Sequence, residues 1–293
     1  ALGYVVNYHN LYHAMGRSMR DHGVACQTNA LVTTLQTDQH QALVTYRQHE
    51  TEKQVRAKLL VLADGGKLAE QIDGVHYHVH DYQHTAIVTN IKTESLRPET
   101  AFERFTLNGP LALLPSGEKY ALVWTMPTVE AKKILGLDDK LFLQHLHEQF
   151  GDRLGDFIQA GKRSSFPLIL KYASTIIGHR SVMIGNAAQT LHPVAGQGFN
   201  LGLRDAWELA SEISHTPPGA PNEPGSGRML AAYSKRRQRD KHIGRTFTDS
   251  LIRLFTADLP LVQTCGGIGL TVLDCLPPAK RLVARQMIFG TKG

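Results

Sequence analysis

The stretch "IGNAAQTLHPVAGQGFNLGLRD", residues 184–205, is the part of the sequence that decides the fold. A short apolar run leads into a turn with Pro193, Gly196 and Gly198, and an amphipathic segment follows. Helices usually begin with Ser, Thr, Asp or Asn as a cap. Glycine there leaves the backbone bare, so that the free N–H groups and the positive end of the helix dipole can receive an anion or a flat ligand. The stretch therefore predicts a strand, a turn and a helix N-terminus that a ligand approaches closely.

The spacing of the glycines alone does not settle what the ligand is. Gly196, Gly198 and Gly202 form the pattern G-x-G-x-x-x-G, whereas the dinucleotide fingerprint is G-x-G-x-x-G. The spacing leaves open that the glycines serve only the close packing of a helix against a strand.

Length and composition are those of an ordinary globular protein with one large domain or two modest ones: 293 residues, 20% charged and 42% hydrophobic. The net charge of +6 favours an anionic membrane surface, a nucleic acid or an acidic ligand without choosing among them. Three cysteines argue against a disulfide framework and for a reducing compartment. No apolar run approaches the roughly 18 residues that span a bilayer. The start, "ALGYVV", reads like a strand entered in mid-course and predicts that the chain is a fragment.

The remaining pattern predicts a mixed α/β protein. Strand-like runs and Gly or Pro turns fill residues 75–127 and predict an antiparallel sheet inserted between other elements. Helical spacing of Phe199, Leu203 and Trp207, continued by Ala210 and Ile213, predicts that these residues form a packed helix face. The other predicted elements are a helix at 11–20, a hairpin at 30–49, a buried strand at 59–62, a helix at 138–150 and a basic helix at 228–255.

Residues 184–205 resemble, almost residue for residue, the second flavin-binding motif of the FAD-dependent aromatic hydroxylases. The segments "LGYVV", "AFERFTLNGPLALLP", "GKRSSFPL" and "LPPAKRLVARQMIFG" look like the ubiquinone-biosynthesis branch of that family, so the resemblance covers essentially the whole chain. Asn186, where the sister enzymes carry Asp, points to the branch that hydroxylates 2-octaprenyl-6-methoxyphenol.

The resemblance implies roles for individual residues. Asn186 is expected to hydrogen-bond the ribityl or phosphate part of FAD, and the backbone from Pro193 onward to lie against the isoalloxazine. "ADGG" at 63–66 looks like the family's middle motif, which implies cofactor contact by Asp64 and Gly65, although a plain strand-ending turn is an equally good interpretation. The residues implied to bind the cofactor in the second motif are Asn186, Pro193, Ala195, Gly196, Gln197, Gly198, Phe199 and Asn200.

Further residues are candidates for the substrate side. Phe105, Leu113 and Trp124 are guesses for the lining of a substrate pocket, with core packing as the alternative for each. His192 either assists deprotonation of a phenol, as a catalytic residue, or is a turn residue that positions Pro193.

The fold implied is α/β, a two-domain flavin monooxygenase fold with a partial FAD domain. We expect that partial FAD-binding domain at 1–66 and 176–215, a substrate domain built on the inserted antiparallel sheet at 67–175, and a C-terminal helical region at 216–293. The implied function is monooxygenation of a polyprenylated phenol with FAD, NAD(P)H and O2. Contact with a membrane surface through basic helices, contact with other ubiquinone-biosynthesis proteins and a cytoplasmic location, peripheral to the inner face of a membrane, are further expectations.

Alternatives stay open at this stage. The family's first flavin motif is absent, and its βαβ unit needs at least about 30 residues. The chain is therefore expected to be truncated and impaired on its own, and a flavin-free, lipid-binding or complex-forming remnant is one alternative. A related flavoprotein that hydroxylates another aromatic compound is a second.

Two local patterns have weaker functional interpretations. "HYHVHDYQH" places His76, His78 and His80 on one strand face with His84 nearby, but no Cys or paired carboxylate completes a metal site, so no metal is expected. The basic cluster comprises Lys235, Arg236, Arg237, Arg239, Lys241 and Arg245. It lacks the interleaved aromatic residues of a nucleic-acid site, which leaves a solvated helix face or a membrane surface.

Overall fold

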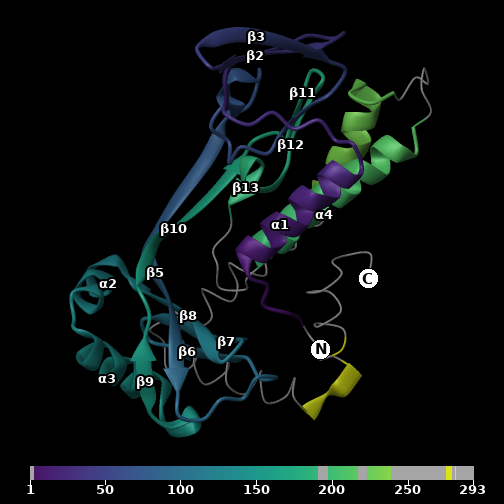
Figure 1. Cartoon of the computed structure of the whole chain (residues 1–293). Coiled ribbons are helices and arrows are strands. Elements are labelled where there is room, and N and C mark those ends of the chain that lie inside the picture. The colour runs from purple at the N-terminus through teal and green to yellow at the C-terminus, as the bar shows by residue number, and fades with distance from the viewer. Residues whose placement is uncertain (1–2, 191–196, 217–222, 239–274, 279–280, 282–293) are drawn as a thin grey trace. The chain divides into compact units, whose positions relative to one another are not determined.

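The computed structural model describes residues 3–190, 197–216, 223–238, 275–278 and 281, and the fold is given for these residues. The chain divides into two compact units, one of residues 1–21, 81–168 and 247–293 and the other of residues 22–80 and 169–246. The elements in chain order (Figure 1) are α1 (Tyr8–Asp21), β1 (Ala30–Thr37), β2 (Ala42–Gln48), β3 (Thr51–Ala57), β4 (Leu60–Leu62), η1 (Ala69–Gln71), β5 (Tyr77–Thr93), β6 (Phe102–Thr106), β7 (Gly109–Ser116), β8 (Lys119–Pro127), α2 (Thr128–Leu135), α3 (Asp139–Phe150), η2 (Asp152–Leu154), β9 (Phe157–Ala160), β10 (Ser164–Ala173), β11 (Ile177–Gly178), β12 (Ser181–Met183), η3 (Gly185–Ala187), β13 (Gln189–Thr190) and α4 (Gln197–Ser214).

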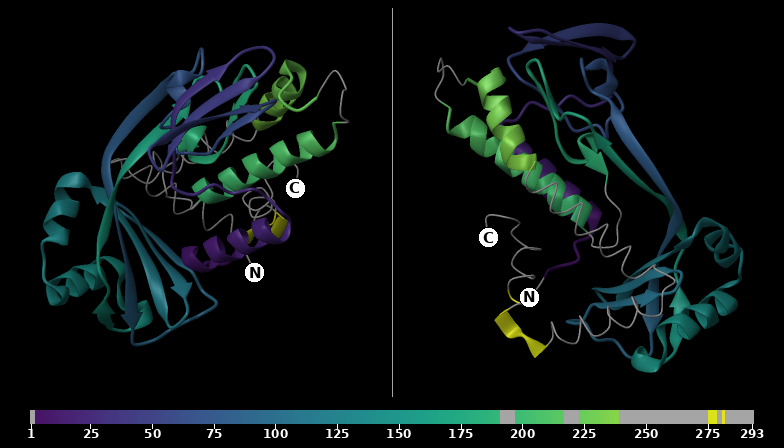
Figure 2. Two further views of the ribbon diagram at one scale, coloured as in Figure 1. Left: turned by 45° about the horizontal axis from the view of Figure 1, so that its top comes forward. Right: turned by 180° about the vertical axis from the view of Figure 1, so that it is seen from behind.

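In the first unit, β5, β8, β7 and β6 form an antiparallel sheet in that order, and β9 pairs with β5. The register places Ile87, Trp124 and Leu111 side by side on neighbouring strands. Since side chains alternate between the faces of a strand, these three residues share one face. Helices α2 and α3 cover that face, and Phe142 and Leu146 of α3 join its core (Figures 1 and 2).

The antiparallel sheet predicted for residues 75–127 and the helix predicted at 138–150 are confirmed. The Asp138 carboxylate accepts a hydrogen bond of 2.8 Å from the Leu141 N–H, which satisfies one of the free donors at the start of α3. Helix α2 was missed, because its eight residues carry one buried side chain, Ala131, and show little apolar periodicity.

In the second unit, β1, β2 and β3 form an antiparallel meander. The predicted hairpin at 30–49 is confirmed as β1 and β2. Strand β3 was missed because "TEKQVRA" is exposed along almost its whole length and has no apolar face.

A second three-stranded sheet, in the order β11-β12-β4, lies in the same unit. Strands β4 and β12 are parallel and pair Leu60 with Ser181 and Leu62 with Met183. Leu62, Val182 and Met183 are buried in a core that also contains Leu209 of α4 and Tyr233. The strand predicted at 59–62 is therefore confirmed, but of its residues only Leu62 is fully buried, and Val61 is exposed. Residues 227–238 are helical, which confirms the first part of the basic helix predicted at 228–255.

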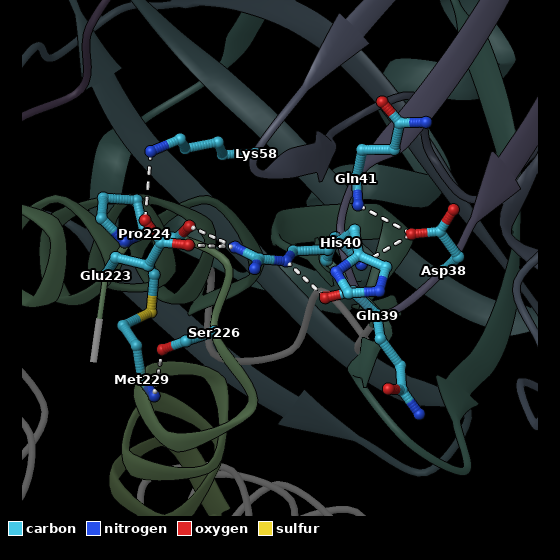
Figure 3. A network of polar contacts seen from close by, with 10 residues as sticks. Asp38, Gln39, His40, Gln41, Lys58, Glu223, Pro224, Ser226 and Met229 are labelled. Atoms are coloured by element: carbon cyan, nitrogen blue, oxygen red, sulfur yellow. Dashed lines mark hydrogen bonds and ion pairs between the residues drawn. The ribbon is translucent and has the colours of Figure 1, made fainter. Parts of the chain in front are cut away.

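A network of polar contacts centred on Glu223 holds the chain where it enters the helix at 227–238 (Figure 3). The Glu223 carboxylate accepts hydrogen bonds from Lys58 at 3.1 Å and from the Arg180 guanidinium at 3.0 Å. Arg180 also donates to the Gln39 carbonyl at 3.0 Å. Separate segments of the second unit are thus tied together at one carboxylate.

The helix face predicted for α4 is wrong except at Ile213, which is partly buried against the core. Phe199, Leu203 and Trp207 are exposed, and Trp207 retains 76% of its accessible surface. The buried face instead carries Leu201, Asp205 and Leu209. Apolar periodicity alone predicted the wrong face of α4, because the buried face includes the Asp205 carboxylate.

In the described part of the chain, none of the helices has the length and apolar character needed to cross a membrane.

Candidate functional site

Two turns lie together at one edge of the β11-β12-β4 sheet. Because β4 and β12 run parallel, their carboxyl ends meet at the same edge, and the Ile184 N–H donates to the Leu62 carbonyl at 3.0 Å there. The turn after β4 contains Asp64, Gly65 and Gly66, and the turn after β12 is η3, which contains Asn186. In α/β sheets, ligands bind beyond the carboxyl ends of the strands. The structure therefore brings together two of the segments predicted to contact a cofactor.

Asp64 shapes the first of these turns. One carboxylate oxygen accepts a hydrogen bond from the Gly66 N–H at 2.8 Å, and the other accepts from the Leu68 N–H at 3.0 Å. The strand-ending turn that the sequence left open is thus present. An ionised carboxylate offers about four lone-pair sites, so Asp64 retains acceptor capacity for a ligand.

Asn186 is exposed, and within the described part of the chain its side chain has no hydrogen-bond partner. The backbone is held one residue before it and one residue after it. The Gly185 N–H donates to the Asp205 carboxylate at 2.9 Å, and the Ala187 carbonyl accepts from the Tyr77 hydroxyl at 2.6 Å. A polar side chain on a fixed backbone, with its own groups unengaged, is arranged to bind a ligand.

Tyr77 links the second turn to the first. Its phenol ring lies against Gly66, where an added Cβ would collide with the hydroxyl group. Gly66 has a φ of +82°, in the left-handed region that glycine adopts without strain. Partial burial, together with the negative charges of Asp64 and Glu70, raises the pKa of Tyr77, so the phenol stays a neutral donor. The Lys171 ammonium lies 3.8 Å from the centre of the same ring.

The glycines of the second motif divide into two kinds. Gly202 packs against Gly185, since a Cβ on Gly202 would lie 3.4 Å from the Gly185 Cα. A Cβ on Gly198, in contrast, would meet no atom within 4 Å. Close helix–turn packing therefore explains Gly202, while open space adjoins Gly198 in the first turn of α4.

The first turn of α4 consists of Gln197, Gly198, Phe199 and Asn200, all predicted to contact the cofactor. It contains no acidic residue, so its free N–H groups and the positive end of the helix dipole favour a negatively charged ligand. Phe199 and Asn200 are exposed. The predicted site residues His192, Pro193, Ala195 and Gly196 lie outside the described residues.

The residues proposed to line a substrate pocket are placed differently from one another. Leu113 and Trp124 are buried in the core of the first unit, where Trp124 packs edge-on against Phe142 of α3. This placement agrees with the core-packing alternative for these two, because the register puts both on the sheet face that α2 and α3 cover. Phe105 is half-buried and alternates with Arg104, so it points to the opposite face.

The structure describes part of the two weaker patterns of the sequence. In the described part of the chain, no three His, Cys, Asp or Glu side chains form a group able to hold a metal ion, and His78 stacks on Tyr172. The basic helix is not a uniformly solvated face. Arg237 is 1% exposed and donates to the Asp205 carboxylate at 2.6 Å, and Arg236 pairs with Glu212. Arg239, Lys241 and Arg245 lie outside the described residues.

Asp205, Arg237 and Tyr77 are the residues that the sequence analysis missed as parts of the site. In the sequence, Asp205 is the last residue of the stretch at 184–205, and Arg237 is one charge in a basic cluster. A signal was available for Asp205, because an acid in the middle of an amphipathic helix, on the side opposite the exposed aromatic residues, indicates a buried ion pair.

The residues present fit a nucleotide cofactor. Asn186 offers a side chain without a partner in the described part of the chain, the backbone at Gly65 and Gly198 is open on its Cα side, and α4 presents a helix N-terminus. Fold and site together are those of an α/β protein with two ligand-accessible turns at the carboxyl ends of parallel strands. The chain belongs to the FAD binding domain family, whose model matches residues 4–243.

The curated relatives include ubiquinone hydroxylases. Ubiquinone hydroxylase UbiL of Rhodospirillum rubrum is 34% identical over 265 residues, 90% of this chain and 61% of that protein. Ubiquinone hydroxylase UbiM of Neisseria meningitidis is 29% identical over 98% of this chain and 62% of that protein. An uncharacterized Synechocystis protein, slr1300, is 34% identical over 85% of this chain and 61% of that protein. The chain thus spans about three-fifths of the length of these relatives.

Solved structures share the fold. The p-nitrophenol 4-monooxygenase PnpA of Pseudomonas putida matches 98% of this chain and 72% of its own, with a TM-score of 0.74 and 15% identity. The anhydrotetracycline hydroxylase OxyS of Streptomyces rimosus matches 97% of this chain and 56% of its own, with a TM-score of 0.69 and 20% identity. The chain therefore has the α/β fold of flavin-dependent monooxygenases, as the sequence predicted.

Proposed function

We propose that this chain is part of an FAD- and NAD(P)H-dependent monooxygenase that hydroxylates a polyprenylated phenol in ubiquinone biosynthesis. The observation that carries the proposal is the Asn186 turn, which lies beside the Asp64 turn. Its backbone is held one residue before and one residue after Asn186, whose side chain has no partner among the described residues. The names of two relatives, ubiquinone hydroxylases of Rhodospirillum rubrum and Neisseria meningitidis, supply the substrate class. The division into a FAD-binding part, a substrate part and a C-terminal helical part is included in the proposal.

In this assignment the protein binds and orients, and few of its side chains need to react. Asn186 holds a polar part of the cofactor by hydrogen bonds, and the first turn of α4 favours negative charge on it. Asp64 fixes the Gly65–Gly66 backbone that adjoins the same edge of the sheet. His192 is proposed to assist removal of the phenolic proton.

FAD, when bound, supplies transfer of two electrons from NAD(P)H and activation of O2. In the balanced reaction, one oxygen atom replaces a ring hydrogen as a hydroxyl group, and the other leaves as water with a proton from solution. Exclusion of water and orientation of the ring are the contributions of the chain.

The proposal is tested by measuring FAD binding through quenching of flavin fluorescence, beside product formation from a polyprenylated phenol. Replacement Asn186→Ala is expected to weaken FAD binding about five- to tenfold, the worth of one hydrogen bond. The control is Asn108→Ala, at an exposed turn of the first unit, which should bind FAD like the wild type. If FAD binds neither to the wild-type chain nor to a version preceded by the family's first flavin-binding unit, the enzyme assignment fails and a flavin-free lipid-binding or complex-forming role takes its place.

The substrate is tested separately from the cofactor. Hydroxylation of a phenol with a polyprenyl chain, detected by mass spectrometry as gain of one oxygen atom, supports the ubiquinone assignment. Hydroxylation of a short-chain phenol alone would instead indicate a flavoprotein acting on another aromatic compound.

Contact with a membrane surface belongs to the proposal because a polyprenyl chain resides in a bilayer and the net charge is +6. A peripheral position at the cytoplasmic face of a membrane, beside other ubiquinone-biosynthesis proteins, follows from it. Cosedimentation with anionic vesicles that falls at high salt, and does not occur with neutral vesicles, is the expected result. Equal cosedimentation with neutral vesicles would contradict an electrostatic contact.

A further inference from the structure

A buried ion pair lies directly behind the Asn186 turn. The Asp205 carboxylate is fully buried, accepts from the Arg237 Nε–H at 2.6 Å through one oxygen, and accepts from the Gly185 N–H at 2.9 Å through the other. Arg237 is 1% exposed. One carboxylate thus joins α4, the helix at 227–238 and the turn that carries Asn186.

Stability alone is a poor explanation for this arrangement. The cost of removing two charges from water is large, and buried ion pairs can often be replaced by apolar residues of similar volume without loss of stability. What an apolar pair cannot supply is the hydrogen bond to Gly185. Gly185 has a φ of +57° and lies against Gly202, so the turn is fixed in both its conformation and its distance from α4.

We infer that Asp205, oriented by Arg237, is a positioning residue that sets the Asn186 turn for cofactor binding. The inference rests on the proposed function, since it concerns the same site. Asp205 itself does not touch the cofactor. It fixes the Ile184–Gly185 peptide, one residue before Asn186, and the Asn186 side chain then needs no rearrangement when the ligand arrives.

Two charge-free double variants separate this role from stability. D205N/R237Q replaces the ion pair with two amides. The new amide oxygen at position 205 still accepts from the Gly185 N–H, and the new NH₂ group there donates to the amide oxygen at position 237. D205L/R237M fills the same space with apolar side chains and leaves the Gly185 N–H without its acceptor. The measurements are the dissociation constant for FAD, by fluorescence quenching, and the thermal unfolding midpoint of the flavin-free protein.

We expect D205N/R237Q to bind FAD within about twofold of the wild type and D205L/R237M to bind about tenfold more weakly, the cost of one hydrogen bond to a fixed backbone. Similar unfolding midpoints for the two variants would assign the difference to positioning. Equal FAD affinity of the two variants would overturn the inference, whatever their stability. Absence of FAD binding by both the wild-type chain and the version preceded by the family's first flavin-binding unit would refute the proposed function instead, so the two failures are distinguishable.

A third variant covers the case in which D205L/R237M does not fold. A Cβ at Gly202 would already be in contact with the Gly185 Cα, at 3.4 Å, so Gly202→Val places further methyl groups against the Gly185 turn and leaves the ion pair intact. It is expected to fold and to weaken FAD binding several-fold by displacing the turn. Binding of FAD by Gly202→Val with wild-type affinity would show that the position of this turn does not govern the site, and would overturn the inference.

Discussion

The Tyr77 hydroxyl donates a hydrogen bond of 2.6 Å to the Ala187 carbonyl. Tyr77 begins β5, and Ala187 lies 110 residues later in the turn after β12. The ring of Tyr77 occupies the space that Gly66 leaves by having no Cβ. One phenol therefore sets the distance between the two turns at the carboxyl ends of β4 and β12.

Tyr77→Phe removes this hydrogen bond and keeps the ring. We expect a loss of about 1 kcal/mol in the free energy of unfolding and weaker FAD binding, because the Ala187 peptide is freed. Urea denaturation and flavin fluorescence measure the two effects. The matched control is Tyr46→Phe in the same unit, because the Tyr46 hydroxyl has no hydrogen bond within the described residues. Equal effects of the two substitutions would contradict a special role for Tyr77.

Alanine substitutions at Gly65 and Gly66 can separate the cost of backbone strain from the cost of a steric collision with Tyr77. Both have positive φ, +78° and +82°, so alanine at either position costs about 1 kcal/mol in strain. A Cβ on Gly65 meets no atom within 4 Å, whereas a Cβ on Gly66 collides with Tyr77. Gly66→Ala is therefore expected to destabilise the flavin-free protein clearly more than Gly65→Ala.

The combination of Gly66→Ala with Tyr77→Phe tests the cause of that difference. Removing the hydroxyl relieves part of the collision, so the double variant should be more stable than the sum of the two single losses predicts. If urea denaturation instead shows that the two losses in the free energy of unfolding are additive, then other atoms shift to relieve the collision and the Tyr77 hydroxyl is not its cause.

Glu223 gives the second unit a predictable dependence on pH. Hydrogen bonds from Lys58 and Arg180 lower the pKa of Glu223 below its ordinary value of 4.5. A carboxylate whose pKa is lower in the folded state stabilises the protein above the unfolded-state pKa, and that contribution is lost as the pH falls through the folded-state pKa. The wild type should therefore exceed Glu223→Gln in stability at pH 7, and the difference should vanish at low pH.

This effect is measured by thermal unfolding of both proteins from neutral pH down to about pH 3, which is below the ordinary range of carboxyl pKa values. Glu118→Gln, in the exposed turn between β7 and β8, is the control and should show no such convergence. Because the Glu223 contacts are partly exposed, the difference should also shrink at high salt. A difference between wild type and Glu223→Gln that stays constant with pH would contradict an ionic role.

The sequence predicted the fold and a candidate site, but not the contacts that hold the candidate site. Regular apolar patterns located β4, the inserted sheet and α3, because each of these elements has a continuous buried face. The sequence patterns did not predict strand β3 and helix α2, because these elements form through hydrogen bonding and local geometry and contain few buried side chains. The packed face of α4 was misplaced for the opposite reason, because Asp205 is as buried as its apolar neighbours.

The same limit applies to the candidate site. Asn186, Gly198 and Asp64 were identified by a motif, and a motif is local in sequence. Tyr77 lies 110 residues before Ala187, and Arg237 lies 32 residues after Asp205. Such pairings depend on how the strands and helices pack against one another, and a local sequence pattern does not predict that packing.

The placement of Leu113 and Trp124 in the core gives a last prediction. Leu113 is fully buried beneath α2 and α3, so Leu113→Ala should lower the free energy of unfolding by about 2–5 kcal/mol through lost burial and a residual cavity. Phe105 is half-buried on the opposite face of the same sheet, and Phe105→Ala should cost less stability. If the substrate lies on that face, Phe105→Ala raises KM for the phenol, while Leu113→Ala leaves KM unchanged in the fraction that folds. A raised KM for Leu113→Ala at unchanged stability would instead return Leu113 to the substrate pocket.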